Sequence, residues 1–313
     1  MKRFRTVFMG TPEFAVPCFK AISRQTEIVG VVTQPDKPRG RGQKLMPSPV
    51  KVFAKSQGFP VFQPDKVREE HFVESMEALR PDLIVVVAFG QILPQRVLDI
   101  PSCGCINVHA SLLPRYRGAA PMQWSIINGE RKTGVTTMFM DAGLDTGDML
   151  LKQEIDIGDD MTLAELHDAL MELGAKVLVE TLERLSEGTL ERKPQTDEGS
   201  SYAPMIGKET GNIDWERPAK AIHDLVRGLN SWPGAYTFLD GNKYKIWRTR
   251  VLPQGADAPP GTVLRADKQG LFAATGEGSL EILELQASGG RKMAARDYLL
   301  GHGIRLPARF GKT

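Results

Sequence analysis

The stretch Leu83-Ile84-Val85-Val86-Val87-Ala88-Phe89 is an unbroken run of apolar residues. A run of this length without polar alternation is typical of a strand that is buried on both faces, as at the centre of a parallel sheet covered by helices. It is too short to cross a membrane as a helix. Strand and helix signals alternate around it from residue 1 to about residue 190, which predicts an α/β domain with a mostly parallel, Rossmann-like sheet.

Residues 5–9 predict the first strand of this domain. The following Gly10-Thr11-Pro12-Glu13 predicts the start of a helix, with a threonine N-cap and a proline at the first helical position. The turn lacks the second and third glycines of a dinucleotide site, and no Walker loop occurs, which argues against nicotinamide and ATP as cofactors. Further strands are expected at 27–33, 60–62, 105–109, 133–140 and 149–157, and further helices at 48–57, 68–79, 119–127 and 162–185.

The C-terminal third of the sequence differs in character from this α/β pattern. Residues 189–207 contain Gly, Pro, Ser, Thr and Asp without apolar periodicity, so we predict a linker between a catalytic domain at 1–188 and a second domain at 208–313. After a short helix at 218–228, Asp240-Gly241-Asn242 indicates a hairpin. Strands expected at 235–239, 243–251, 261–265, 271–274 and 280–285 predict a small, OB-like β-barrel, a fold that does not by itself establish a function.

The composition fits an ordinary globular protein of about two domains, with 41% apolar and 25% charged residues among 313. From Lys208 onward, 16 Lys and Arg stand against 11 Asp and Glu, whereas the preceding residues are net acidic. A basic C-terminal third fits a polyanionic partner, and it equally fits a domain that happens to be basic. The three cysteines have no metal-ligand spacing and no signal peptide is evident, so we expect reduced thiols, no metal and a cytoplasmic location.

The densest group of reactive residue types is Asn107-Val108-His109-Ala110-Ser111-Leu112-Leu113-Pro114-Arg115-Tyr116-Arg117-Gly118. Side chains alternate along a strand, so Asn107 and His109 point to the same face, at the carboxyl end where open α/β sheets bind ligands. An amide and an imidazole side by side can hold the oxyanion of a tetrahedral intermediate. The alternative is a polar pair at a strand end with ordinary hydrogen bonds.

A second motif, Asp141-Ala142-Gly143-Leu144-Asp145-Thr146-Gly147-Asp148, follows another apolar strand. Its glycines and acids indicate a tight turn that presents one carboxylate inward. A carboxylate near His109 would favour the charged imidazole and accept the proton lost by an attacking amine. The alternative is a simple acidic turn, and metal binding is disfavoured because no second His or Cys lies at ligand spacing.

Together these two motifs resemble those of the 10-formyltetrahydrofolate-dependent formyltransferases. The resemblance implies 10-formyltetrahydrofolate as the co-substrate and Asn107, His109 and Asp145 as a catalytic triad. It implies that a neutral amine attacks the formyl carbon while Asn107 and protonated His109 stabilise the oxyanion. Asp145 would keep His109 charged and relay the amine's proton. The implied folate pocket is lined by the loop after the central strand and by the Ser-Leu-Leu-Pro segment, that is, by Phe89, Gly90, Gln91, Ile92, Leu93, Ser111, Leu112, Leu113 and Pro114. Phe89 departs from the tyrosine that is common in the family.

The acceptor of the formyl group is indicated by a basic loop within residues 34–51, which begins Gln34-Pro35-Asp36-Lys37-Pro38-Arg39-Gly40-Arg41. The loop has a net charge of +4 and no apolar face, so we expect it to be exposed and mobile when free. A basic loop suits a phosphate backbone, although a solvated charged loop is the usual meaning of such a run. The loop is similar to the insertion of family members that formylate methionyl-tRNA. The tRNA-binding residues implied are Lys37, Arg39, Arg41, Lys44, Lys208, Lys243, Lys245 and Arg248.

The spacing of the basic residues in the predicted hairpin sets a condition on this interpretation. Lys243 and Lys245 share one face of a regular strand, whereas Arg248 and Arg250 share the other. All four can meet RNA on one side only if a bulge intervenes. The tail at 303–313 is also basic, but it matches no motif.

The resemblance therefore implies formyl transfer to the α-amino group of methionine on initiator tRNA, for translation initiation, by a cytoplasmic monomer. Three alternatives remain. A formyltransferase acting on an amino-sugar nucleotide would share the catalytic motifs, but the Gly-Arg-Gly loop argues against it. A formyl-folate hydrolase should lack the basic loop, and a non-catalytic RNA-binding protein would tolerate loss of the Asn107, His109 and Asp145 triad.

Overall fold

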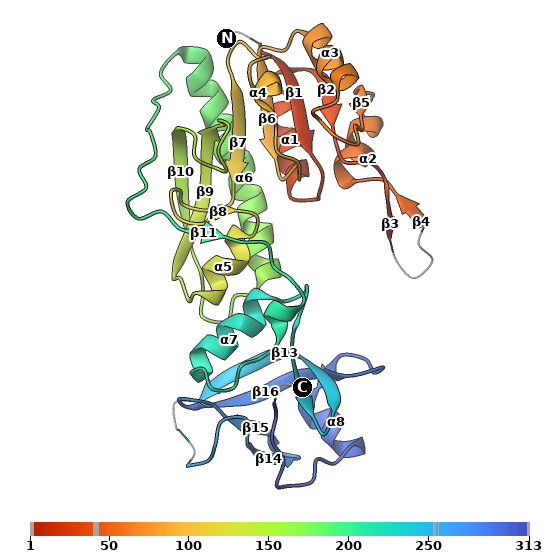
Figure 1. Cartoon of the computed structure of the whole chain (residues 1–313), viewed down its shortest axis with the longest axis vertical. Helices are drawn as coiled ribbons and strands as arrows, with labels where there is room; N and C mark the ends of the chain where they lie inside the picture. The colour runs from red at the N-terminus through yellow and green to blue at the C-terminus, as the bar shows by residue number, and fades with distance from the viewer. Residues whose placement is uncertain (1–2, 40–43, 253–254, 256, 312–313) are drawn as a thin grey trace. The chain divides into compact units, whose positions relative to one another are not determined.

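The computed structural model describes residues 3–39, 44–252, 255 and 257–311, and the chain divides into two compact units (Figure 1). Unit 1 comprises Met1–Gly118, Thr133–Ile155 and His167–Ala203, and unit 2 comprises Ala119–Lys132, Asp156–Leu166 and Pro204–Thr313. Each unit is thus assembled from several chain segments, and the division into 1–188 and 208–313 stays a prediction. Among the described residues, none of the helices combines the length and the apolar character that a membrane span requires.

Unit 1 is built around a seven-stranded sheet in the order β10-β9-β7-β6-β1-β2-β5. The strands from β7 to β5 pair in parallel, whereas β9 runs antiparallel to β7. This arrangement confirms the predicted mostly parallel, Rossmann-like sheet. The strands are β1 (Arg5–Gly10), β2 (Glu27–Val32), β5 (Val61–Phe62), β6 (Leu83–Val87), β7 (Cys105–His109), β9 (Lys132–Phe139) and β10 (Met149–Asp156).

Helices cover both faces of this sheet. On one face, Phe72 and Val97 of α3 and α4 join Ile84 and Val86 of β6 in a buried cluster. On the other face, Phe19 of α1 stacks on Phe8 of β1, with ring centroids 4.6 Å apart. The central strand β6 is buried at all of its positions, as its continuous apolar sequence predicts. The helices are α1 (Ala15–Ile22), α2 (Pro49–Ser56), α3 (Glu70–Leu79), α4 (Gln95–Leu98) and α6 (Leu163–Glu187), the last of which has residues in both units.

Ser48 caps α2, because its side chain accepts a hydrogen bond from the Lys51 amide at 3.0 Å. The corresponding prediction for Thr11 is wrong, since α1 begins only at Ala15. The Thr11 hydroxyl instead donates to the Phe89 carbonyl at 2.9 Å and accepts from the Gln34 amide at 3.3 Å. It thereby ties together the carboxyl ends of three neighbouring strands.

The strand order fixes where this sheet can bind a ligand. The chain passes from β1 outward to β2 and β5, and then returns to β6 and continues outward to β7 on the other side. The order therefore reverses between β1 and β6, and open α/β sheets bind ligands outside the carboxyl ends of the strands at such a switch point. Thr11 and Phe89 lie at this edge.

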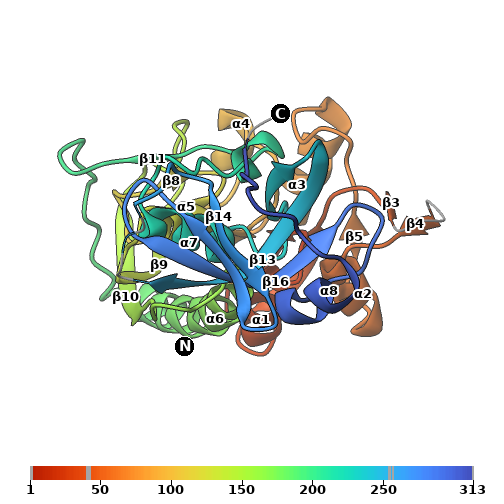
Figure 2. The ribbon, with the colours of Figure 1, turned by 90° about the horizontal axis from the view of Figure 1, so that it is seen from below.

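Unit 2 contains a six-stranded sheet in which all the recorded pairings are antiparallel. The hairpin and the five strands predicted from the sequence are present, and α8 packs against β16 (Figure 2). Its elements are α5 (Pro121–Ile127), η1 (Glu209–Gly211), α7 (Ala219–Gly228), β12 (Ala235–Leu239), β13 (Asn242–Leu252), β14 (Val263–Asp267), β15 (Gly270–Ala274), β16 (Ser279–Ala287), β17 (Met293–Ala294) and α8 (Ala295–Gly301).

The C-terminal residues bridge the two edges of this sheet. Phe238 in β12 and Gly311 exchange two backbone hydrogen bonds, of 3.1 and 3.0 Å. Val263 in β14 donates to the carbonyl of Ala308 at 2.9 Å. Phe310, 3% exposed, stacks on Trp215 with ring centroids 5.1 Å apart. The tail, whose role no motif indicated, therefore joins the edge strands and completes an OB-like antiparallel domain.

Replacing Phe310 with alanine is predicted to lower the free energy of unfolding of unit 2 by about 3–5 kcal/mol, because a buried aromatic ring and its stacking partner are lost. All four tryptophans of the chain lie in unit 2, so tryptophan fluorescence during urea unfolding follows this unit. Arg305→Ala, an exposed change in the same tail, is the control and should alter stability by less than about 0.5 kcal/mol. Equal effects of the two changes would contradict a structural role for the tail.

Candidate active site

Asn107 and His109 lie at the carboxyl end of β7, beside β6, where Val86 is the register partner of Asn107. His109 is the last residue of the strand and is buried, whereas Asn107 is half-buried. Nε2 of His109 lies 2.9 Å from the carbonyl oxygen of Tyr116. A carbonyl can only accept, so Nε2 carries the hydrogen and Nδ1 is left as the ring atom that can exchange a proton.

Asp145 lies in the loop between β9 and β10, in a left-handed backbone conformation with φ of 55°. One carboxylate oxygen accepts a hydrogen bond from the Gly118 amide at 2.8 Å and lies 3.6 Å from Nδ1 of His109. The other accepts a hydrogen bond from the side-chain Nδ2 of Asn107 at 3.4 Å. The structure therefore brings the three predicted catalytic side chains together, although the 3.6 Å separation is too long for a direct hydrogen bond.

The backbone of Gly118 reaches Asp145 only because this residue has no side chain. Its φ is +113°, and a Cβ atom there would lie 2.6 Å from the Tyr202 ring and 2.8 Å from the Ala203 carbonyl oxygen. The close approach arises because β8 (Arg117–Gly118) pairs in parallel with β11 (Tyr202–Ala203). Most of the predicted linker is thus bound to unit 1 and borders the candidate site. The sequence analysis missed this because the segment has neither periodicity nor a motif.

The residues predicted to contact folate after β6 divide into buried and accessible ones. Phe89 and Leu93 are 2% and 3% exposed and belong to the core of unit 1. Ile92 is 78% exposed, and Gln91 accepts a hydrogen bond from the Val67 amide at 3.0 Å. Gly90 has φ of +86° and continues the turn at the switch point. The side chains of Phe89 and Leu93 thus support this turn from within the core.

The Ser111–Pro114 segment is divided in the same way. Ser111 and Leu113 are fully buried, and the Ser111 hydroxyl donates to the Arg115 carbonyl at 2.7 Å. Leu112 and Pro114 are only partly buried. Two of the four predicted contacts are therefore side chains that shape the loop, which leaves Leu112 and Pro114 with surface for a ligand.

Part of the basic loop of unit 1 forms a strand pair that the sequence analysis did not predict. β3 (Lys37–Arg39) and β4 (Lys44–Met46) form an antiparallel hairpin on which Lys37 and Lys44 are exposed, whereas Arg41 lies outside the described residues. Lys51 is bound to Asp36 at 2.7 Å. Hydrogen bonds from Lys51 and then Gln63 hold the pKa of Asp36 below its usual value. Lys51 and Asp36 therefore cancel each other, and the loop's net charge of +4 comes from Lys37, Arg39, Arg41 and Lys44.

The basic hairpin of unit 2 contains the irregularity that its charge pattern requires. The register between β13 and β16 shifts between Ile246 and Arg248 and again before Thr249. The buried positions Ile246 and Thr249 are therefore three residues apart, and the alternation slips by one residue. Arg248 and Arg250 consequently return to the outer face that carries Lys243 and Lys245.

Three lysines predicted to bind tRNA converge in unit 2. Burial, followed by the charges of Lys245 and Lys208, lowers the pKa of Lys243. The ammonium group of Lys243 lies 3.4 Å from the centroid of the Tyr236 ring, and that of Lys245 lies 5.3 Å from the centroid of the Trp247 ring. Mutually repelling cations beside aromatic rings form a surface suited to a polyanion with stacking bases.

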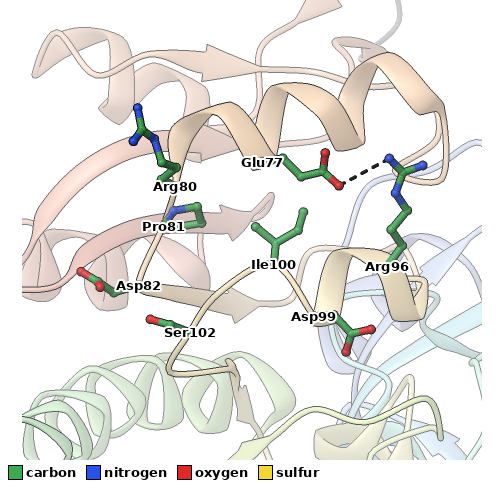
Figure 3. A pocket seen from close by; sticks show the side chains of 8 residues that line it. All are labelled: Glu77, Arg80, Pro81, Asp82, Arg96, Asp99, Ile100 and Ser102. Carbon is green, nitrogen blue, oxygen red and sulfur yellow. Dashed lines mark hydrogen bonds and ion pairs between the residues drawn. The ribbon is translucent and has the colours of Figure 1, made fainter.

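A separate hollow of unit 1 lies at the amino ends of β6 and β7, the end of the sheet away from the catalytic residues (Figure 3). Arg96 in its wall forms ion pairs with Glu70 at 2.6 Å and with Glu77 at 3.4 Å, so the positive charge of this arginine is already paired with carboxylates. Parallel sheets do not bind their ligands at this end, and we assign no function to the hollow.

The described residues contain no group of three or more His, Cys, Asp or Glu side chains placed to hold a metal ion. Cys18 and Cys105 are buried, and burial raises the pKa of each thiol to about 12. Both thiols therefore stay protonated at neutral pH, where a protonated thiol is a poor nucleophile and metal ligand.

Gly118→Ala is predicted to destabilise unit 1 by more than about 1 kcal/mol beyond the change Gly199→Ala. Gly199 also has a positive φ, of +72°, but no atoms lie near its missing Cβ, so it reports the backbone cost alone. Gly118 adds the clash with Tyr202 and Ala203. Thermal unfolding followed by circular dichroism measures the stability of both variants. Equal losses of stability would show that β11 can move away from a Cβ atom at residue 118 without destabilising the unit.

Two family models match the sequence. The model for formyl transferase matches residues 4–182, and the model for the formyl transferase C-terminal domain matches residues 205–303. A methionyl-tRNA formyltransferase of Acetivibrio thermocellus is 53% identical over 302 residues, which are 96% of this chain and 97% of that protein. Another, of Citrifermentans bemidjiense, is 54% identical over 313 residues, which are 100% of this chain and 98% of that protein.

Solved structures share the fold at much lower identity. An N-formyltransferase of Helicobacter canadensis, solved with folinic acid and dTDP-3-aminofucose, has a TM-score of 0.66 at 17% identity and covers 92% of this chain and 99% of its own. HypX of Aquifex aeolicus, solved with tetrahydrofolic acid, has a TM-score of 0.64 at 20% identity and covers 95% of this chain and 47% of its own. The family models and the curated relatives together show that the chain belongs to the formyl transferase family.

Proposed function

We propose that this protein transfers the formyl group of 10-formyltetrahydrofolate to the α-amino group of methionine on initiator tRNA. The observation that carries the proposal is the convergence of Asn107, His109 and Asp145 at the carboxyl edge of the sheet. It occurs in a chain that matches methionyl-tRNA formyltransferases along nearly its whole length. Since methionyl initiator tRNA is used in translation, we expect the protein to act in the cytoplasm. We expect it to be a monomer.

In the proposed reaction, the neutral amine of methionine attacks the formyl carbon and forms a new carbon–nitrogen bond. The bond between that carbon and the folate nitrogen then breaks, and the proton lost by the amine ends on the folate nitrogen. Asn107 and the Nδ1–H of the protonated His109 ring stabilise the negative oxygen of the tetrahedral intermediate, because Nε2–H is bound to the Tyr116 carbonyl. Nδ1 of His109 faces Asp145, so these two groups form the path along which the proton moves.

The proposed folate position is the switch point between β1 and β6. Gly90, Gln91 and Ile92 line it from the turn after β6, and Leu112 and Pro114 from the segment after β7. All of these residues follow strands that end at the same edge as His109, so a formyl group held there lies within reach of the triad. No metal or nicotinamide is required by this chemistry.

The proposed tRNA contacts are electrostatic in both units. In unit 1 the exposed Lys37 and Lys44 lie in the β3 and β4 strands of the hairpin. In unit 2 the irregular register of β13 puts Lys243, Lys245 and Arg248 on one face, beside Trp247. Cations that are spread over a surface and interleaved with aromatic rings suit phosphates and exposed bases better than a single small anion.

The competing function is formyl transfer to an amino-sugar nucleotide, because a structural relative solved with such a ligand shares the fold. Their identity to this chain is 17%, compared with 53% for the methionyl-tRNA enzymes. The direct test is transfer of labelled formyl from 10-formyltetrahydrofolate to methionyl initiator tRNA, with an amino-sugar nucleotide as the parallel acceptor. Labelling of the sugar alone would refute the proposal.

His109→Asn is predicted to lower kcat for formyl transfer about 10²–10³-fold, because one donor to the oxyanion is lost while the side chain remains polar. The matched control is His71→Asn on the exposed surface of α3, which should leave kcat unchanged. Both rates are measured with saturating folate and tRNA. If His109→Asn retained at least half of the wild-type rate, this ring would have no direct part in the reaction.

Lys243→Ala is predicted to raise the KM for methionyl-tRNA several-fold. The slope of log KM against log salt concentration should fall by about one, as expected for the loss of one phosphate contact. The KM for 10-formyltetrahydrofolate should stay constant, because the lysine lies in unit 2. Lys268→Ala, an exposed lysine at the turn between β14 and β15, serves as the control. Parallel changes for both lysines would indicate an unspecific charge effect.

A further inference from the structure

Gln195 lies in the segment between α6 and β11, which has no regular structure except one isolated bridge at Lys193. Its side-chain amide nitrogen donates to the backbone carbonyls of Asp145 and Gly147, each at 2.8 Å. An amide nitrogen has two hydrogens, so both are used on the loop that carries the catalytic carboxylate. Its carbonyl oxygen accepts a hydrogen bond from Nε of Arg117 at 3.0 Å.

Arg117 links Gln195 to the other side of the candidate site. It is the β8 neighbour of Gly118, whose amide holds the carboxylate of Asp145. The Arg117 side chain also donates to the Thr196 carbonyl at 3.3 Å. Gln195 therefore joins the backbone of Asp145 to Arg117 of β8. The next residue of β8, Gly118, binds the Asp145 carboxylate through its backbone amide.

The loop around Asp145 needs such a support. Asp145 holds a positive φ, which costs free energy in a residue with a side chain. Gly147 is fixed at one end of the loop, since a Cβ atom there would lie 1.9 Å from the Phe139 carbonyl oxygen. The other end, from Asp141 to Leu144, is exposed. The two hydrogen bonds from Gln195 to Asp145 and Gly147 fix the second half of the loop, which carries the carboxylate.

The segment that carries Gln195 is itself anchored on both sides. Lys193 exchanges two backbone hydrogen bonds of 2.9 Å with Met149 at the start of β10. The Ser201 hydroxyl accepts from the Tyr116 amide at 2.8 Å, and the Tyr116 carbonyl is the partner of Nε2 of His109. One segment therefore contacts the loop of Asp145 and the residue that orients His109.

We propose that Gln195 is a positioning residue that sets the separation between the Asp145 carboxylate and the His109 ring. This inference rests on the proposed function for its kinetic consequence. Proton transfer requires the two heavy atoms to come within hydrogen-bond reach, and they stand at 3.6 Å in this structure. A displacement of the loop by about 1 Å is enough to lower the rate about 100-fold.

The first test is Gln195→Met, which keeps the length of the side chain and removes both donors and the acceptor. We expect kcat to fall about 10- to 100-fold, with the KM values for 10-formyltetrahydrofolate and for methionyl-tRNA within about twofold of wild type. Asp197→Ala is the matched control, because it removes another partner of Arg117 that is 97% exposed and leaves Gln195 in place. Its kcat should stay within about twofold.

The second variant is Gln195→Glu, which preserves an acceptor for Arg117 but places an oxygen against the carbonyls of Asp145 and Gly147. We expect its kcat to fall at least as far as that of Gln195→Met. The donor to the loop is lost, and a carboxylate oxygen now faces the carbonyl oxygens of Asp145 and Gly147, which are also acceptors. A rate near wild type for Gln195→Glu would show that the bond to Arg117 alone matters, and it would overturn the proposal.

A measurement without substrates separates this proposal from the proposed function. In Gln195→Met, amide hydrogen exchange of residues 141–148 should accelerate about tenfold while that of β6 is unchanged. If the wild type does not formylate methionyl-tRNA, the proposed function fails and this exchange result still decides the positioning role. Uniformly faster exchange across unit 1, or a change in KM with kcat intact, would assign Gln195 a general structural role and overturn the proposal.

Discussion

The hydrogen bond from the Gly118 amide to the Asp145 carboxylate is the contact on which the candidate site depends. It fixes a partly buried charge 3.6 Å from the His109 ring, and a buried carboxylate without such a donor would be costly. The bond exists only because Gly118 adopts a φ closed to other residues while it lies against β11. The site therefore requires a pairing between two short strands that are far apart in the chain.

The sheets of the two units present their polar side chains in different ways. In unit 1, parallel strands buried on both faces hold the side chains of His109 and Asn107 at one fixed edge of the sheet. In unit 2, an antiparallel sheet closed by the tail at 308–311 exposes an outer face. The register shift in β13 gathers basic side chains there, which a regular strand would have divided between solvent and core.

The structure adds local details that the sequence analysis did not foresee, and each has an identifiable cause. Thr11 has the composition of an N-cap, but its hydroxyl is needed between strand ends that lie 23 and 78 residues away. The basic loop lacks an apolar face, yet β3 and β4 pair through their backbones, which requires no apolar pattern. Phe89 and Leu93 follow a strand that ends at the ligand edge, but their side chains turn back into the core.

The sequence by itself determined the main strands of both sheets, the type of sheet and the candidate triad, because apolar periodicity and a dense polar motif are local properties of the chain. The tertiary structure alone decided that Gln195 binds the Asp145 loop from 50 residues away and that Ser201 binds Tyr116 from 85 residues away. Such contacts satisfy backbone groups, which every residue carries alike. The residue types involved do not predict these contacts, and only the folded chain brings the partners together.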